Sequence, residues 1–398
     1  MTKWHIAHVA CIAAVVGVGL GAAPQAVADR PAQQTRSAHP THPTHPTHVV
    51  FPGESIQQAV DAAQPGSTVL VASGTYRESV RISTPGITLR GMGPRTVVEP
   101  AAAEAVAAEP AAAGAAAGAA AAGAAVVDPA VTKAADDCGG AGNGVCVIGT
   151  KDRKVEDVTV ANLTVTGFTG SGVYALDTDR LTVRHVTAVK NGVWGIAQER
   201  SVRGVFRKNT ARDNGDAGLF LANTIKAEQG ATDTGGAVVA HNRLEGNRIG
   251  LTVRRLRNLT VADNHLTGNC AGIFVVGDEN MPRAGALTVR DNLIDRNNKS
   301  CPKTARLDAL QGTGIVLTGA EDTLVTRNRI TGNAGASPLS GGIVVWKSFV
   351  GTTSERNRIT GNVLEDNAPA DLINTDTVGK GNTFTGNTCR ASRPAGLC

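Results

Sequence analysis

Apolar and polar residues alternate along many short segments of this chain, and a period of two predicts β-strands rather than helices. One kind of segment reads aliphatic-Thr-Val, and a second kind begins with Gly followed by an aliphatic residue. In the second kind, the residue after Gly is expected inside the fold and its successor outside. The first kind occupies 158–160, 181–183, 259–261 and 287–289, and the second occupies 172–175, 195–198, 218–221, 250–253 and 272–275. Stacked inward side chains would form aliphatic ladders, the main source of stability.

A phrase with Asn at its first and sixth positions recurs every 22 to 36 residues. Such a period is typical of a solenoid, in which each coil buries its apolar face against its neighbours. Asn tolerates left-handed backbone at tight bends, and stacked Asn amides can form a hydrogen-bonded ladder. Sugar binding is the alternative role, but recurrence in almost every coil favours the scaffold. The pairs are Asn209/Asn214, Asn242/Asn247, Asn264/Asn269, Asn292/Asn297, Asn328/Asn333, Asn357/Asn362 and Asn382/Asn387.

The folded part is expected to begin near Phe51 with a short helix. Ser55 and Gln58 have the spacing of a capping box, in which Ser55 accepts from the third amide and Gln58 reaches back. An apolar face follows at helical spacing, and a Pro-Gly turn at 65–66 leads into a strand at 68–71. An amphipathic helix here would cover the open end of the first coil.

The run from Glu54 to Gly91 resembles the N-terminal segment of right-handed parallel β-helix proteins of the pectin-lyase-like superfamily. The Asn/Gly repeats resemble the parallel β-helix repeats of the same superfamily, and together they cover 51–398 apart from the insertion at 101–137. The resemblance implies an all-β, single-stranded right-handed parallel β-helix with a short N-terminal capping helix. It does not imply one activity, because the superfamily includes lyases, hydrolases, epimerases and non-enzymatic members.

The known catalytic signatures of that superfamily are missing from this sequence. The complete Asn-Thr-Asp, Asp-Asp and Gly-His-Gly set of polygalacturonases is absent because the sequence has no Gly-His-Gly, and there is no Asp-Pro-His of alginate epimerases and no Arg-x-Pro-x-x-Arg of pectate lyases. His185, His241 and His265 stand alone and are interpreted as turn or surface residues. The repeats also resemble those of the exported accessory protein for copper maturation of nitrous oxide reductase, without its Met- or Cys-rich copper motif.

The N-terminal residues are not expected to belong to the fold. Lys3, an apolar run of about 15 residues and small residues at 26–28 indicate a secretory signal peptide over 1–28, too short in its apolar part to span a bilayer. Residues 29–48 read as a Pro/Thr/His linker, and 49–398 as one β-helix domain with a flexible Ala/Gly-rich insertion at about 101–137. His39, His42, His45 and His48 are weak candidates for metal ligands.

The cysteines of an exported protein are expected to form disulfides, because the extracellular compartment is oxidising. Sequence proximity favours the pairs Cys138–Cys146, Cys270–Cys301 and Cys389–Cys398, and no Cys-x-x-Cys spacing supports a metal site. The formal net charge of +5 suits an acidic polysaccharide, whereas the lack of a basic run with aromatics argues against nucleic acid. A secreted monomer without stable membrane insertion is the expectation.

An outward stripe on the Gly-led strands is the predicted saccharide groove. Tyr174, Phe220 and Phe274 occupy matching outward positions and would serve as sugar platforms, with Arg254 and Arg255 contacting carboxylates. The alternative is that these aromatic side chains pack beneath a loop.

The catalytic candidates are carboxylates near this stripe, namely Asp177, Asp179, Glu199, Asp213 and Asp216. A pair of them would suit glycoside hydrolysis, and Asp213 with Asp216 could ligate Ca²⁺ for uronate chemistry. Solvated turn residues are the alternative reading. The expected function is therefore engagement of extracellular carbohydrate, as a lyase, epimerase or hydrolase, with a non-catalytic envelope scaffold and a copper accessory protein as the alternatives.

Overall fold

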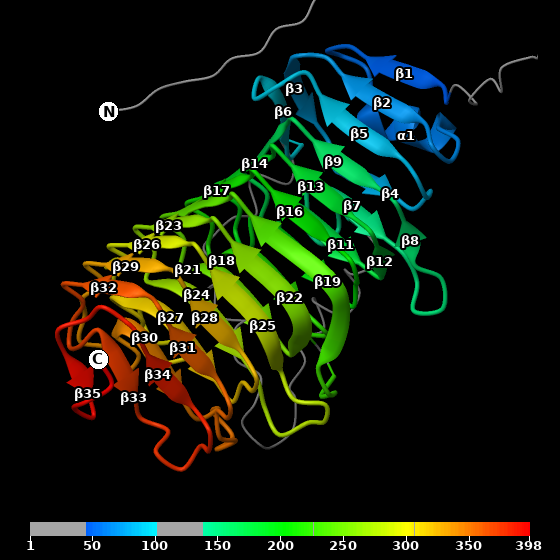
Figure 1. The fold of residues 1–398 in the computed structure, drawn as a ribbon. Coiled ribbons are helices and arrows are strands. Elements are labelled where there is room, and N and C mark those ends of the chain that lie inside the picture. Colours follow the sequence, from blue (N-terminus) through cyan, green and yellow to red (C-terminus); the bar gives the residue numbers. More distant parts are fainter. Residues whose placement is uncertain (1–44, 102–137, 226, 306) are drawn as a thin grey trace, which may run out of the picture. The chain divides into compact units, whose positions relative to one another are not determined.

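The computed structural model describes residues 45–101, 138–225, 227–305 and 307–398, and they fold into coils as the repeats predict. Each full coil contributes one strand to each of three sheets, named A, B and C in chain order. Strands of successive coils pair in parallel, so each sheet is a stack along the solenoid (Figure 1). The described chain is thus a parallel β-helix, and the observed strands lie close to the predicted ones.

The strands of sheet A, in stacking order, are β1 (Thr47–Val50), β2 (Thr68–Val71), β5 (Thr88–Gly91), β9 (Thr159–Ala161), β13 (Thr182–Arg184), β16 (Val205–Arg207), β19 (Thr232–Ala240), β22 (Leu256–Ala262), β25 (Gly285–Arg290), β28 (Leu324–Thr326), β31 (Arg358–Thr360) and β34 (Thr383–Thr385). Those of sheet B are β3 (Gly74–Arg77), β6 (Thr96–Glu99), β10 (Thr164–Thr166), β14 (Thr187–Val189), β17 (Thr210–Arg212), β20 (Arg243–Glu245), β23 (His265–Thr267), β26 (Leu293–Asp295), β29 (Arg329–Thr331) and β32 (Val363–Glu365). Those of sheet C are β4 (Val80–Ile82), β7 (Val145–Ile148), β11 (Val173–Leu176), β15 (Ile196–Glu199), β18 (Ala217–Ala222), β21 (Ile249–Arg254), β24 (Ala271–Val276), β27 (Thr313–Thr318), β30 (Gly341–Trp346), β33 (Leu372–Asn374) and β35 (Ser392–Arg393). A small additional pair is β8 (Val155–Glu156) with β12 (Thr178–Asp179).

The inward side chains stack into the predicted aliphatic ladders. Val173, Ile196, Leu219, Leu251 and Ile273 are fully buried in the main hydrophobic core, as alternation predicts. The outer faces of the sheets differ. Most strands of sheets A and B alternate between buried and accessible residues, whereas those of sheet C from β7 to β27 are buried at every position. Sheet C therefore has a covered outer face, and sheets A and B have open ones.

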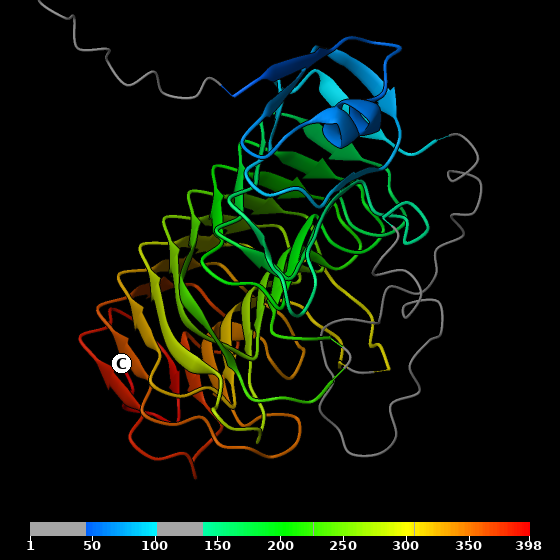
Figure 2. The same cartoon turned by 90° about the vertical axis from the view of Figure 1, so that its right-hand side faces the viewer.

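The predicted helix closes the N-terminal end of the stack. Helix α1 (Ile56–Ala62) lies at that end, with Ile56 and Val60 buried against the first coils (Figure 2). The Ser55 hydroxyl accepts from the Gln58 amide at 3.2 Å, as the capping box requires. The second predicted bond, in which the Gln58 side chain reaches back, is wrong. The carboxylate at the helix N-terminus is that of Glu78, which accepts from the Ile56 and Gln57 amides at 2.7 and 3.0 Å. A carboxylate from the first coil thus satisfies the helix N-terminus.

Two Asn ladders run along the two corners of sheet B. In each, the side-chain oxygen of one Asn accepts from both the backbone amide and the side-chain nitrogen of the Asn one coil earlier, with Nδ2–Oδ1 distances of 2.8–3.1 Å. The first ladder, between sheets A and B, contains Asn209, Asn242, Asn264, Asn292, Asn328, Asn362 and Asn387. The second, between sheets B and C, contains Asn191, Asn214, Asn247, Asn269, Asn297, Asn333 and Asn367 and ends on Asp371. The predicted ladder is confirmed.

The structure adds one detail to the Asn prediction and corrects another. The pairs Asn357/Asn362 and Asn382/Asn387 flank strands of sheet A, and Asn357 bonds to Asn382 in a separate short ladder at the third corner. The left-handed backbone also lies elsewhere. At the corner between sheets A and B it is adopted by the residue before the ladder Asn, as at Lys208 (φ 56°) and His241 (φ 56°). This arrangement leaves the Asn amide for the ladder and turns the preceding side chain outward.

The cross-links agree with the sequence prediction. Disulfides join Cys138 to Cys146, Cys270 to Cys301 and Cys389 to Cys398, which confirms the predicted pairing. The fold begins earlier than predicted, because β1 includes His48 and pairs with β2. The signal peptide at 1–28, most of the linker and the insertion at 102–137 lie outside the described residues. Among the residues that are described, no helix is long and apolar enough to cross a membrane.

The ladders predict a position-dependent cost of removing an Asn. Asn269→Ala would leave the Asn247 amide and the Leu244 carbonyl without partners in a buried corner. Each such group costs about 1–3 kcal/mol, so we expect the free energy of unfolding to fall by about 2–5 kcal/mol. Asn387→Ala, at the half-buried last rung, should cost less than about 1 kcal/mol because water can replace its bonds. Denaturant unfolding with intact disulfides measures both, and equal costs would contradict a cooperative role of the ladder interior.

Candidate functional site

The predicted aromatic stripe exists in register but is not exposed. Tyr174, Phe220 and Phe274 occupy one outward column of sheet C, separated by Ala197 and Thr252. Their exposed fractions are 8%, 0% and 0%. The prediction of an open saccharide groove at this stripe is therefore wrong, and the alternative that loops cover the aromatics is confirmed.

The cover is a second hydrophobic core built by residues of the loops that flank sheet C. Trp194 stacks on Phe220 with ring centroids 4.3 Å apart, and Phe349 stacks on Phe274 at 6.5 Å. Leu307 and Leu310, from the segment that follows Cys301, join the same cluster. The aromatics thus stabilise the loops by burial instead of offering a platform to a sugar ring.

The two predicted carboxylate-binding arginines hold a loop in place. Arg254 and Arg255 are almost fully buried. Arg254 donates to the Thr224 carbonyl, and Arg255 donates to the Ala227 carbonyl at 3.1 Å and forms an ion pair with Asp278. Both side chains therefore fix the segment after β18 to the outer face of sheet C, and neither is placed to meet an external carboxylate.

The predicted acidic residues are likewise engaged in structural contacts. Asp177 accepts hydrogen bonds from Nε and Nη2 of Arg200 at 3.1 and 2.7 Å, and Asp179 forms an ion pair with Arg203. Glu199 accepts from the Tyr174 hydroxyl at 2.8 Å and from the Ile225 amide at 2.9 Å. Burial, followed by the charge of Glu199, raises the pKa of Tyr174 well above its ordinary value. These partners give Asp177, Asp179 and Glu199 structural roles, and their part in a reaction stays a prediction.

Asp213 and Asp216 do not share a site. Asp213 is exposed and pairs with Arg212 at 3.1 Å, whereas Asp216 is buried and accepts from the indole nitrogen of Trp194 at 3.1 Å. Across the described ranges there is no group of three or more His, Cys, Asp or Glu side chains that could hold a metal ion. The Ca²⁺ site stays a prediction. His48 lies in β1 and His45 two residues before that strand, and His39 and His42 lie outside the described residues.

Sheets A and B carry polar groups that are open to solvent. At the corner between them, Arg184 and Arg207 lie directly opposite each other on β13 and β16, and Lys208 follows at the bend. Arg90 occupies the same outward column two coils earlier, with Ala161 between. Among the described residues no carboxylate pairs with any of these four side chains, which we call the basic strip.

The basic strip differs from several other bends of this molecule, where an Arg is paired. At those bends the carboxylate lies on the same or the preceding coil, as in Arg180–Asp157, Arg290–Asp291, Arg327–Asp291 and Arg356–Asp322. Like charges directly opposite each other on neighbouring strands destabilise the sheet. The strip therefore carries a cost that an anionic partner would offset.

A second open cluster lies on sheet B, beyond the C-terminal end of the basic strip. The His265 Nε2 atom is 2.6 Å from Asp295 Oδ1, and its Nδ1 atom is 3.2 Å from Arg243 Nη1. Burial alone would raise the pKa of Asp295, but hydrogen bonds from His265 and Arg296 outweigh it, and the pKa lies below its ordinary value. His185 and His241 are exposed bend residues, as predicted, whereas His265 has partners that the sequence analysis missed.

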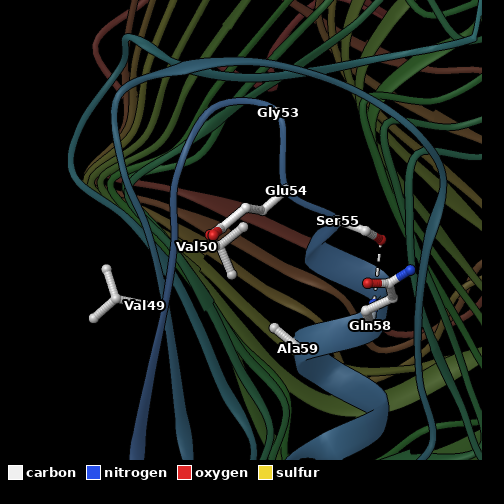
Figure 3. Close-up of a pocket in the computed structure, with 7 residues that line it drawn as sticks. All are labelled: Val49, Val50, Gly53, Glu54, Ser55, Gln58 and Ala59. Atoms are coloured by element: carbon white, nitrogen blue, oxygen red, sulfur yellow. Dashed lines mark hydrogen bonds between the residues drawn. The ribbon is translucent and has the colours of Figure 1, made fainter.

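A shallow depression at the N-terminal end of the stack is lined by residues around the start of α1 (Figure 3). Its polar side chains are used by the fold, since the Ser55 hydroxyl caps the helix and Glu54 accepts from the Phe51 amide at 2.8 Å. The depression therefore belongs to the helix cap, and the open faces of sheets A and B remain the better site.

Asp216 predicts a specific pH dependence of stability. Burial raises its pKa to about 6, against a bond from Trp194 and the charge of Arg248, which lower it. Because the folded state binds this proton more tightly, stability should fall as pH rises from about 4 to about 6. Asp216→Asn keeps an acceptor for Trp194 and removes the titration, so its stability relative to the unmodified protein should rise by at most about 3 kcal/mol across that window. Denaturant midpoints at several pH values test this, and a pH-independent difference would contradict it.

Two models of known protein families match parts of this chain. A family model described as "Right handed beta helix region" matches residues 136–284, and one described as "Periplasmic copper-binding protein (NosD)" matches residues 222–392. No curated protein matches the chain.

Several solved structures share the coil arrangement at low identity. The A-module of the Azotobacter vinelandii mannuronan C-5 epimerase AlgE4 is 19% identical, with 84% of this chain and 90% of that one covered and a TM-score of 0.51. An alginate lyase from Paenibacillus is 13% identical (86% and 99% covered, TM-score 0.49), and the periplasmic alginate epimerase AlgG is 14% identical (82% and 60% covered, TM-score 0.49). At such identities a likeness concerns the fold alone. The strand order and the likeness to the AlgE4 A-module show that the described residues have the fold of a parallel β-helix, and residues 136–284 match the right-handed class of that fold.

Proposed function

We propose that this protein is exported and binds an acidic polysaccharide along the corner between sheets A and B. The observation that carries the proposal is the basic strip, in which Arg184 and Arg207 are stacked in register without a carboxylate partner among the described residues. Strands of neighbouring coils lie about 4.8 Å apart, so the strip offers positive charges at a regular rise. A chain of carboxylated sugars lying along the solenoid would present negative charges to it.

The chemistry of the strip suits carboxylates in particular. A guanidinium group can donate two parallel hydrogen bonds to a carboxylate, and such charge-assisted bonds are stronger than neutral ones. The outward column also lacks large side chains between the arginines, since Ala161 lies between Arg90 and Arg184. A mannuronan C-5 epimerase uses the same fold, and the proposal extends that class of acidic polymer to this chain because of the strip.

The proposed export rests on the apolar N-terminal run and on the cysteines. Three disulfides within the described residues are the bonds expected of an oxidising compartment. A non-catalytic envelope scaffold is compatible with the same fold. Binding of a polymer at the strip would be common to an enzyme and a binding protein, so binding is the property to test first.

Paired substitutions test the strip. The double variant Arg184→Ser/Arg207→Ser should weaken binding of a polyuronate by at least tenfold, because a hydrogen bond to a charged group contributes about 1.5 kcal/mol or more. The control Arg327→Ser/Arg329→Ser removes the same charge from exposed positions whose arginines are paired with Asp291 and Glu365, and should change affinity less than about twofold. Affinity is measured by calorimetry with polymannuronate and with neutral dextran. Equal weakening by both doubles, or equal affinity for dextran, would contradict the proposal.

A copper accessory role is the second candidate, favoured by the match of residues 222–392 to a family described as periplasmic copper-binding. The His-rich segment is the candidate for its ligands, since the described residues hold no three-ligand cluster. Deleting 29–44 keeps β1 and its His48, and removes His39 and His42. Under this candidate function, calorimetry should show Cu²⁺ binding to the full exported chain and at least tenfold weaker binding to the deletion variant; unchanged or absent Cu²⁺ binding would exclude it.

A further inference from the structure

The cluster Arg243–His265–Asp295 on sheet B is a hydrogen-bonded relay on an open face. The three side chains come from the successive strands β20, β23 and β26, with His265 opposite Leu293 and Asp295 diagonal to it. The His265 side chain is 34% exposed, whereas that of Asp295 is 7% exposed. One end of the relay is therefore fixed in the protein, and the imidazole is accessible to a ligand.

The neighbours of His265 determine which ring nitrogen carries the proton. Asp295, as a carboxylate, only accepts, so Nε2 at 2.6 Å donates to it. Arg243 only donates, so Nδ1 at 3.2 Å accepts from it. In the neutral form of the imidazole the proton therefore lies on Nε2 and the basic lone pair on Nδ1, on the side of the guanidinium. Thr267 and Arg296 also donate to Asp295, at 3.3 and 2.9 Å, and hold the carboxylate in place.

Arg243 places a positive charge beside this basic nitrogen. It is exposed, it pairs with Glu245 at 2.8 Å, and it lies two residues beyond His241 at the corner where the strip runs. A substrate carboxylate that took over the Arg243 contact would release Nδ1 next to the carbon that bears the carboxylate. A base next to a cation is the arrangement needed for removing a proton from that carbon, because the cation stabilises the developing negative charge.

The relay is also in line with the proposed binding surface. His265 lies two coils beyond Arg207 and Lys208, roughly 10 Å along the stack at the usual strand spacing. An acidic polysaccharide held on the basic strip and following the corner would reach it. The coil between contributes Arg243 itself, so the positive side chains continue to the imidazole.

We propose that His265 is the catalytic base of a β-elimination that cleaves a bound polyuronate, with Arg243 contacting the carboxylate and Asp295 as a positioning residue. His265 Nδ1 takes the proton from C5, and the C5–H electron pair forms the C4=C5 double bond. The C4–O glycosidic bond breaks, and the leaving oxygen takes a proton from water. The products are an unsaturated uronate end and a new reducing end, without any oxidant or metal. This inference rests on the proposed binding of a polyuronate at the strip.

The test uses the full exported chain with polymannuronate, polyguluronate and polygalacturonate, followed by the ultraviolet absorbance of the new double bond. His265→Gln can still donate an amide hydrogen to Asp295 but has no basic nitrogen, so kcat should fall at least a hundredfold while polymer affinity changes less than threefold. Arg329→Gln, in the same outward column two coils further, should leave kcat within twofold. Asp295→Asn should lower kcat and shift the acidic limb of the pH–rate profile to lower pH, which a purely structural role would not do.

Three results would overturn the inference. In the first, His265→Gln retains kcat within threefold of the unmodified protein. In the second, the unmodified protein binds the polymers but releases no unsaturated product from any of them, which leaves the proposed binding function intact. In the third, C5 is inverted without chain cleavage, which replaces elimination by epimerisation. Loss of polymer binding at the strip variants is measured separately, so failure of the binding proposal is distinguishable from failure of the catalytic one.

Discussion

The buried amide ladders at the corners of sheet B are the interaction on which the rest of this fold depends. Each coil must turn twice within a few residues, and a turn leaves backbone groups without strand partners. An interior Asn satisfies them from both sides, since Asn242 donates to the Phe206 carbonyl of the preceding coil and to Asn264 of the next. Its backbone amide bonds to the same Asn264 oxygen. In the coils that carry the ladders, the corner residues are thereby held in one hydrogen-bonded register from coil to coil, as are the inward aliphatic side chains beside them.

The ladder also determines which side chains face outward. Because the Asn points into the corner, the residue before it takes the left-handed backbone, a conformation that costs a non-Gly residue roughly 1–2 kcal/mol. Lys208 and His241 occupy this position, and their side chains project into solvent beside the strand ends. The same rule places Asp291 and Arg327 at later bends, where they pair with each other. The scaffold thus turns the bend residue of successive coils toward solvent, and the local sequence decides whether that residue is charged and whether neighbouring charges neutralise each other.

How far the sequence predicts the structure depends on the range of the interaction involved. Alternation and repeat spacing are local, so the coils, the inward residues and the disulfides could be predicted. The burial of Phe220 and Phe274 could not, because it depends on Trp194 and Phe349 folding over from loops whose paths no period describes. The hydrogen bond from Arg254 to the loop after β18 could not be predicted from the sequence for the same reason. The stacking of Arg184 on Arg207 was within reach, since aligning 181–183 with the following coil places the two residues opposite each other.

The covering of sheet C explains why the candidate chemistry lies on sheets A and B. Long connections leave the coils at the ends of sheet C strands, as at 277–284 and 347–357, and the second carries Phe349, which stacks on Phe274 of its outer face. Sheets A and B are joined by bends of only two or three residues in most coils, too short to fold back over either face. A long polymer can reach only such an uncovered face. Charge left unpaired there is therefore stronger evidence of a ligand than aromatic residues on sheet C, where burial already accounts for them.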